Sequence, residues 1–313
     1  MVLYIDKENL ISLVHSKDKD RAGFVEYSNL IRKNLDIQYN FSKEEIRGNE
    51  FLTFWFSQLG SGVGGVQEFC PPRNIVPKRP MKSNFIKDLD ARGRSALFFL
   101  NDIDKCTAVE SRCCVMVSKI GDELSKLKEV FQPDEQGEIL AYKITDWENF
   151  LPKLPLSDII LCDNHYFKDK EVYEANENEI ISFLSSIPQN SPVNVVIIVK
   201  DSEVDTEIDL AAEQSKIKSL VKKASGSTKS TVTILTTYAT HDRALITNYY
   251  RVKQGSSFHI KDIHVKHDVS AEIKTHAIRK NHEFTVSLLN EYQDIASQPV
   301  KCIGDKICNY LTF

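Results

Sequence analysis

The sequence predicts an α/β protein whose C-terminal half is a mixed sheet flanked by helices. Three observations carry this prediction. Short apolar runs typical of buried strands recur through this half of the chain, at 157–164, 193–201 and 231–237. Segments with helical periodicity separate these runs, at 174–186 and 206–224. Strands alternating with helices favour a parallel sheet. After His241 the pattern changes to successive short strands, which makes the predicted sheet mixed.

The sequence of the N-terminal part predicts a second α/β domain of uncertain fold. Ser42 and Glu45 form a capping-box pattern, which indicates a helix start. The polar stretch PDEQGE at 133–138 is the best boundary, giving domains 1–135 and 136–313. The other expected strands are 2–5, 35–41, 95–101, 113–118, 138–144, 244–250, 251–254 and 256–260, and the other expected helices begin near Lys7 or span 24–33, 51–59, 121–131, 146–154 and 284–296.

Composition favours a globular cytoplasmic protein. Hydrophobic residues make up 42% of the 313 residues and charged residues 27%. Asp6, Lys7 and Glu8 interrupt the apolar core that a secretory signal needs, and no apolar run has the length of a membrane-spanning helix. The seven cysteines form no CxxC pair and have no zinc-ligand spacing, so we expect reduced thiols, no metal and no cofactor.

The net charge of −4 conceals a basic segment. Between Ser215 and His282 there are 13 Lys or Arg residues against 4 Asp or Glu, a balance of +9, so the rest of the chain carries −13. Six of the eight histidines also lie in this segment. A solvated basic face is the simplest interpretation, but a local positive field also attracts anionic partners.

One motif in the basic segment resembles phospholipase-D-like enzymes. Those enzymes carry H-x-K-x4-D, followed seven residues later by G-S-x-N. In this chain the histidine is present, the lysine is replaced by arginine, the aspartate by asparagine and the last asparagine by phenylalanine. The matching positions are His241, Arg243, Asn248, Gly255, Ser256 and Phe258.

The resemblance implies that phosphate binding survives and that cleavage is lost. In the family one histidine attacks phosphorus and a second histidine protonates the leaving group, while lysine and serine hold phosphate oxygens. Arg243 can still bind phosphate with two parallel hydrogen bonds. Asn248 has no charge to support an imidazolium, so His241 is a catalytic residue only if the site is active. The expected phosphate-binding residues are His241, Arg243, Asn248, Ser256, Arg251 and Lys253.

A narrower resemblance is to the MIT-C domain, a degenerate phospholipase-D-like fold. It covers roughly residues 138–262 and rests on an ordered series of features. These are Asp163, Tyr166, the strand VVIIVKD, the helix that ends at Ala224, the triplet His-Asp-Arg at 241–243, and Asn248. The family implies a homodimer and binding of anionic phosphoinositide head groups. The three-helix trafficking module is not recognisable in the N-terminal half, so membrane remodelling is not expected to carry over.

Three functions follow as expectations. The first is a non-catalytic module that binds a phosphorylated ligand within a larger complex, with a prokaryotic defence system as one context. Nucleic acid is favoured over lipid because Tyr249 and Tyr250 stand beside Arg251 and Lys253. The second is a metal-independent phosphodiesterase or nuclease, active as a homodimer that brings two copies of His241 together. The third is a protein-interaction subunit that docks through its acidic N-terminal half.

Two weaker patterns occur in the N-terminal half. The glycine-rich stretch 60–65 follows a helix and has no P-loop lysine, which favours a plain loop. YIDKENL resembles the opening of NYN-type ribonucleases, with Asp6 and Asn9. That chemistry needs further carboxylates at the metal, and Asp102, Asp104 and Asp163 are candidates only because they lie at the ends of expected strands. Without an ordered set, the sequence does not favour this interpretation.

Overall fold

The chain forms two compact units, which are described separately. In the computed structural model their main segments are Met1–Glu129 and Val130–Ile278, and the second unit also contains the C-terminal strand β12 (Lys301–Gly304). The described residues are 1–39, 41–60, 96–99, 110, 116–136, 138–140, 154–185, 192–238, 243–254, 272–277 and 299–305. None of the helices in these ranges is long and apolar enough to cross a membrane.

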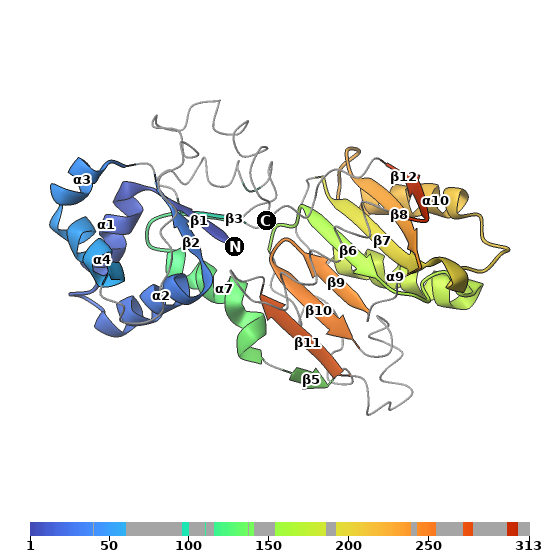
Figure 1. The fold of residues 1–313 in the computed structure, drawn as a ribbon, viewed down its shortest axis with the longest axis horizontal. Helices are drawn as coiled ribbons and strands as arrows, with labels where there is room; N and C mark the ends of the chain where they lie inside the picture. Colours follow the sequence, from blue (N-terminus) through green and yellow to red (C-terminus); the bar gives the residue numbers. More distant parts are fainter. Residues whose placement is uncertain are drawn as a thin grey trace. The chain divides into compact units, whose positions relative to one another are not determined.

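The first unit is built on a four-stranded parallel sheet in the order β2-β1-β3-β4 (Figure 1). Its strands are β1 (Val2–Ile5), β2 (Asp36–Gln38), β3 (Ala96–Phe99) and β4 (Met116–Ser118). The side chains of Leu3, Leu97 and Phe98 are fully buried, as expected when both faces of a parallel sheet are covered. The chain runs from β1 to β2 on one side and then to β3 on the other. Strand order therefore reverses at β1.

The helices of the first unit agree with the sequence patterns. They are α1 (Lys7–Ser16), α2 (Arg21–Asn34), α3 (Lys43–Arg47) and α4 (Glu50–Gly60), and α7 (Glu123–Gln136) follows β4. The predicted capping box is confirmed, because Ser42 Oγ accepts the Glu45 N–H and the Glu45 carboxylate accepts the Ser42 N–H. Trp55 of α4 is fully buried, so the aromatic run of this helix contributes to the core.

The second unit is built on an eight-stranded mixed sheet in the order β12-β8-β7-β6-β9-β10-β11-β5 (Figure 1). β6, β7 and β8 are parallel, and all other neighbouring strands in the sheet are antiparallel. The strands are β5 (Glu138–Leu140), β6 (Asp158–Cys162), β7 (Asn194–Lys200), β8 (Thr231–Thr237), β9 (Ala244–Thr247), β10 (Tyr250–Gln254) and β11 (Glu272–Ala277), with β12 at one edge.

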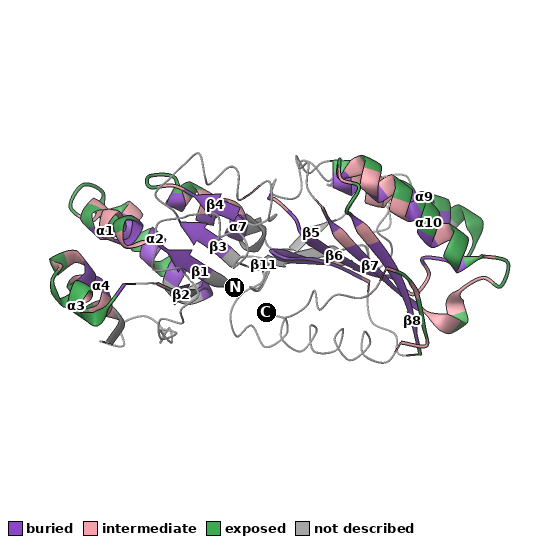
Figure 2. Cartoon of the chain, turned by 90° about the horizontal axis from the view of Figure 1, so that it is seen from above, coloured by how far each residue is buried: buried purple, intermediate pink, exposed green. Residues whose placement is uncertain are grey.

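Two helices connect the parallel strands of this sheet. α9 (Lys170–Ser185) joins β6 to β7, and α10 (Leu210–Ala224) follows β7 and a short 3₁₀ turn at Asp201–Glu203. Figure 2 shows both helices over one face of the sheet, with their exposed residues turned outward. The five central residues of β7 are buried. Burial of each such aliphatic side chain contributes about 1.5–3 kcal/mol to folding.

The α/β class and the parallel strands β6–β8 were correctly predicted, but the end of one helix was wrong. The helix expected to end near Phe131 continues as α7 to Gln136, through most of the polar stretch PDEQGE, and β5 begins at Glu138. Pro133 lies in the last turn of α7, where it removes one helical hydrogen bond without forcing the helix to end. β11 and β12 were not predicted. The expected helices at 146–154 and 284–296 and the strand at 256–260 lie essentially outside the described residues.

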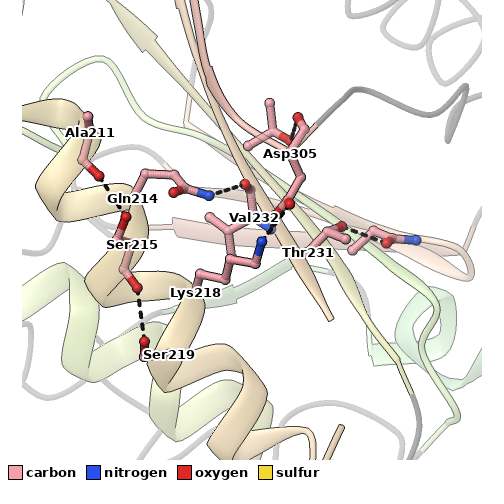
Figure 3. Close-up of polar contacts among 10 residues, drawn as sticks. Ala211, Gln214, Ser215, Lys218, Ser219, Thr231, Val232 and Asp305 are labelled. Carbon is pink, nitrogen blue, oxygen red and sulfur yellow. Dashed lines mark hydrogen bonds and ion pairs between the residues drawn. The ribbon is translucent and has the colours of Figure 1, made fainter. Parts of the chain in front are cut away.

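The strand β12 is fastened to the sheet by Asp305. Its carboxylate forms an ion pair with Lys218 Nζ of α10 at 2.5 Å and accepts the Val232 N–H of β8 at 3.0 Å (Figure 3). The Asp305 carbonyl also accepts the Thr233 hydroxyl at 2.9 Å. Burial raises the pKa of Asp305, but Lys218 and the Val232 N–H lower it by more, so the pKa lies below its usual value. Gly304 has φ +105°, and a Cβ there would lie 2.6 Å from the Val232 carbonyl oxygen, so only glycine fits.

We predict that Asp305→Asn lowers the stability of the second unit by about 1–3 kcal/mol at neutral pH, since it removes a charged hydrogen-bond partner. Because the folded pKa is depressed, this contribution is present above the unfolded pKa of about 3.9 and is lost as pH falls through the folded value. Urea unfolding at several pH values measures both effects. Glu174→Gln, which removes an exposed ion pair with Lys170, is the control and should change stability by less than about 1 kcal/mol. Equal effects of the two variants would contradict the role of Asp305.

Candidate functional site

The strongest candidate site lies at one edge of the large sheet, where β6, β7 and β8 end. Strand order reverses at β6, because the chain continues to β7 on one side and later returns as β9 on the other side. In open α/β sheets, ligands bind outside the carboxyl ends of the strands at such a reversal. We call this region the carboxyl edge and define it by six residues that lie at or next to strand ends there: Asp163, Lys200, Tyr238, Arg243, Lys253 and Lys301.

A buried acid holds Arg243 at the carboxyl edge. The register pairs Cys162 with Ala244, which brings Asp163 and Arg243 together from positions 80 residues apart. Arg243 Nε donates to Asp163 Oδ1 at 3.0 Å, and the two side chains are 20% and 4% exposed. In the described part of the chain this is the one interaction of the Arg243 side chain. Its two terminal Nη groups therefore remain available to an anion.

The loop after β6 fixes Asp163 in turn. Asp163 Oδ1 also accepts the His165 N–H at 2.9 Å, and the Asp163 N–H donates to the Ile198 carbonyl at 3.0 Å. Tyr166 and Phe167, further along the loop, are fully buried and pack edge to face with centroids 4.7 Å apart. The carboxylate is therefore held in a rigid position, and Arg243 is oriented by it.

Other charged residues of the carboxyl edge are paired on the surface. Lys301 Nζ lies 3.0 Å from Asp201, and Lys200 Nζ lies 3.6 Å from Glu203. His165 Nδ1 lies 3.3 Å from the same Glu203. These pairs are partly exposed, and exposed ion pairs contribute roughly 0–1 kcal/mol each. These weak ion pairs keep the lysine side chains at the edge, and the lysines can still bind another anion.

Asn248 lies at the other end of β9. It follows Thr247, which pairs with Ile159 near the start of β6, and its Oδ1 accepts the Ser157 N–H at 3.2 Å. Arg243 and Asn248 are separated by five residues, about 16 Å of extended chain. Asn248 is buried. The structure therefore does not bring these two expected phosphate ligands together, and Asn248 fastens the amino ends of the strands.

A row of polar side chains continues from that end. Asp158, Asn194 and Thr231 are register partners at the start of β6, β7 and β8. Asn194 Nδ2 donates to Asp158 at 3.2 Å, and Thr231 donates to Asn194 Oδ1 at 2.7 Å. Each amide or carboxylate is satisfied by its neighbour on the next strand. This row is a structural device that sets the register of the parallel strands.

The remaining expected phosphate ligands are divided. Lys253 pairs in register with Ala244, so it lies at the carboxyl edge on the strand next to β9, on the face opposite to Arg243. Arg251 pairs with Ile246 within β10 and is buried. His241 and Ser256 lie outside the described residues. Arg243 and Lys253 are thus the two expected residues that lie at this end of the sheet, on its opposite faces.

The aromatic residues that suggested nucleotide stacking are not exposed. Tyr249 and Tyr250 are buried, and their N–H groups both donate to Thr247 Oγ1 at 3.1 Å in the turn between β9 and β10. Neither ring is therefore presented to a ligand. Tyr238, the first residue after β8, is 82% exposed at the carboxyl edge. Sequence reasoning missed it because exposure of a residue at a strand end has no periodic signal.

A second polar region lies at the carboxyl ends of β1 and β3 in the first unit. The Asp6 N–H donates to the Phe99 carbonyl at 3.1 Å, which places Asp6 where strand order reverses. Asn9 lies in the first turn of α1, is fully buried, and has no hydrogen-bond partner for Oδ1 or Nδ2 within the described chain. Helical side chains are tilted toward the helix N-terminus, so Asn9 leans toward Asp6. An unsatisfied buried amide costs about 1–3 kcal/mol.

Tyr27 and Glu123 lie near the same ends. The Tyr27 ring is 6.3 Å from that of Phe99, and Glu123 begins α7 after β4. Burial raises the pKa of the Tyr27 hydroxyl, and the charge of Glu123 raises it further. Burial also raises the pKa of the Glu123 carboxyl.

Across the described ranges, no group of three or more His, Cys, Asp or Glu side chains is arranged to hold a metal ion. Asp102 and Asp104 are not among the described residues.

Comparisons with known proteins assign no family. No family model matches the sequence, and no curated protein matches it as a relative. A solved structure that resembles the chain is that of TrmBL2, an archaeal chromatin protein described as having a novel mode of DNA binding. The two chains are 11% identical over 96% of this chain and 100% of TrmBL2, with a TM-score of 0.27. A likeness this weak carries no argument.

We predict that Asp163→Ala destabilises the second unit by about 3 kcal/mol, because it leaves the Arg243 guanidinium partly buried without its counter-ion. Urea unfolding followed by circular dichroism measures the change. Glu203→Ala is the matched control at the same edge, where the lost ion pairs are exposed, and should cost less than about 1 kcal/mol. A small effect of Asp163→Ala would mean that Arg243 does not depend on this acid.

Proposed function

We propose that this protein binds a phosphorylated ligand, in the first place nucleic acid, at the carboxyl edge of the large sheet and does not cleave it. The observation that carries the proposal is how the guanidinium of Arg243 is bonded. A rigid acid orients its guanidinium through Nε, and the Nη groups remain available. Two parallel N–H donors on a planar cation match the geometry of phosphate oxygens. Lys253 on β10 and Lys200 on β7 add positive charge at the same end of the sheet.

The proposal includes a degenerate phospholipase-D-like domain of the MIT-C type in the second unit. Parallel strands β6 to β8, followed by the hairpin β9–β10 that begins at Arg243, agree with the order of elements expected from that resemblance. Loss of catalysis is supported by Asn248, which is uncharged and bonded to Ser157 at the far end of β9. Homodimerisation and membership of a larger complex remain part of this proposal.

We predict that the protein retards labelled single- or double-stranded nucleic acid in EDTA and leaves it intact on a denaturing gel. Arg243→Gln should weaken binding about tenfold, since a hydrogen-bonded charge contributes about 1.5–3 kcal/mol. Affinity should fall steeply with salt, with a slope that decreases by about 0.7 for single strands in the variant. Arg243→Lys keeps a counter-ion for Asp163 and should bind with intermediate affinity.

Lys229→Gln is the matched control, because it removes one exposed cation of the basic segment just before β8, at the opposite edge of the sheet. Its binding should be unchanged. Cleavage in EDTA that disappears in His241→Ala would overturn the non-catalytic proposal in favour of a metal-independent phosphodiesterase. Absence of any binding would leave the chain as a protein-interaction subunit, docking through its acidic N-terminal half.

The first unit supports a second candidate, a metal-dependent ribonuclease of the NYN type. The favouring observation is the parallel sheet with Asp6 at its reversal point and the unsatisfied buried amide of Asn9 beside it. Carboxylate and amide oxygens are ligands that Mg²⁺ accepts, so these two residues fit such an ion. A bound divalent cation would activate water and neutralise charge on phosphate.

On this second candidate, RNA is cleaved with Mg²⁺ or Mn²⁺, and chelation with EDTA stops the reaction. Asp6→Asn should reduce the rate at least about a hundredfold, because the neutral amide is a weaker metal ligand. Asp18→Asn removes an exposed carboxylate just after α1 and should leave the rate unchanged. Metal-dependent cleavage that persists in Asp6→Asn would point to a contaminant and remove the candidate.

A further inference from the structure

We infer that Tyr238 is a base-stacking platform and that the ligand of the carboxyl edge is a single-stranded nucleic acid. This inference rests on the proposed phosphate-binding function and specifies its ligand. It depends on the exposure of one aromatic ring and on the order of strands around it.

Tyr238 is unusually exposed for a large apolar residue. Among the described residues the other exposed large hydrophobics are Val25 at 48% and Ile120 at 37%, against 82% for Tyr238. The two residues before it, Thr236 and Thr237, are buried in β8. Tyr238 therefore directly follows the last paired residue of β8, Thr237, and its ring is exposed beyond the end of the sheet. An anchored and solvated ring can stack on a planar ligand with little ordering cost.

Cations lie on both strands that neighbour β8. β7 pairs Lys200 with Thr237, the residue before Tyr238. β12 pairs Lys301 with Thr236, so Lys301 and Lys200 point to opposite faces of the sheet. Lys301 Nζ and Lys200 Nζ are held by Asp201 and Glu203 at 3.0 and 3.6 Å. These pairs are partly exposed, so a phosphate can compete for the lysines at small cost.

Two cations share one face of the sheet at the carboxyl edge. Paired residues on neighbouring strands share a face, so the register places Lys301 and Arg243 on the face of Thr236, and Lys200 and Lys253 on the opposite face. Tyr238 lies two residues after Thr236. Neighbouring strands are about 4.8 Å apart, so the row from Lys301 on β12, past Tyr238 after β8, to Arg243 before β9 spans about 19 Å. An extended polynucleotide backbone can follow such a row, with a base placed over the ring. Positive grooves with interspersed aromatics are how proteins bind single strands without sequence preference.

The geometry favours a single strand over a duplex. Bases in a duplex stack on one another, so their faces are not available to a side chain. Tyr249 and Tyr250 cannot contribute stacking because they are buried, which leaves Tyr238 as the exposed ring at this edge within the described residues. A ligand recognised only through phosphate, such as a short polyphosphate, would use the cations and not the tyrosine.

The test compares Tyr238→Ala, Tyr238→Phe and Tyr238→Trp in the full chain. The probes are a single-stranded oligonucleotide, its duplex and inorganic tripolyphosphate, and affinity is measured by fluorescence anisotropy or competition. Stacking on one base contributes about 1–3 kcal/mol, so Tyr238→Ala should lose about tenfold or more for the single strand. It should lose nothing for tripolyphosphate. Tyr238→Phe should restore binding, and the fluorescence of Tyr238→Trp should be quenched by the single strand.

The outcomes separate this inference from the function on which it rests. If Arg243→Gln weakens binding of every probe while Tyr238→Ala weakens none, phosphate binding stands and stacking is refuted. If the duplex binds more tightly than the single strand, the ligand class is wrong. If none of the probes binds the wild-type chain, the proposed function itself fails. Tyr238 is exposed, and thermal melting of the three variants checks that the fold is unchanged.

Discussion

The antiparallel pairing of β6 with β9 determines what each end of the large sheet can do. It brings Asp163 beside Arg243 at one end and Asn248 beside Ser157 at the other. Side chains alternate along a strand, so a slip of one residue would turn Arg243 away from its acid and expose buried aliphatic residues. The row Asp158–Asn194–Thr231 opposes such a slip in the adjoining parallel strands. One end of the sheet is therefore closed by internal hydrogen bonds, while the other presents cations.

The charges of the carboxyl edge differ in how firmly they are held. Asp163 is buried and accepts two hydrogen bonds, so it acts as a fixed support for Arg243. Asp201 and Glu203 are nearer the surface and hold lysines loosely. A ligand can therefore displace the outer carboxylates while the inner one stays in place. Such a site exchanges ion pairs on binding, and its affinity depends on ionic strength more than on shape.

Sequence reasoning found the parallel strands because aliphatic runs such as VVIIV are unambiguous. It assigned Arg243 and Asn248 to one phosphate-binding site, and phosphate binding by Arg243 stays a proposal. A strand was expected at 244–250, but the motif did not reveal that the two residues lie at opposite ends of a strand. Tyr249 and Tyr250 look like surface aromatics in the sequence, and only the turn at Thr247 explains their burial. Asp163 follows a strand and was noted for that reason, but its partner lies 80 residues away. Long-range pairing of this kind has no local signature.

The strand β12 has a consequence for association between copies of the chain. An uncovered edge of a sheet offers a row of unpaired N–H and C=O groups to another chain. Here β8, a seven-residue strand rich in β-branched residues, would be such an edge if β12 did not cover it. β12 has four residues, is largely exposed, and ends at Gly304, and the strand at the other edge, β5, has three. Two short terminal strands thus protect a long sheet from adding further strands, and the Asp305 ion pair that fastens β12 also guards against aggregation.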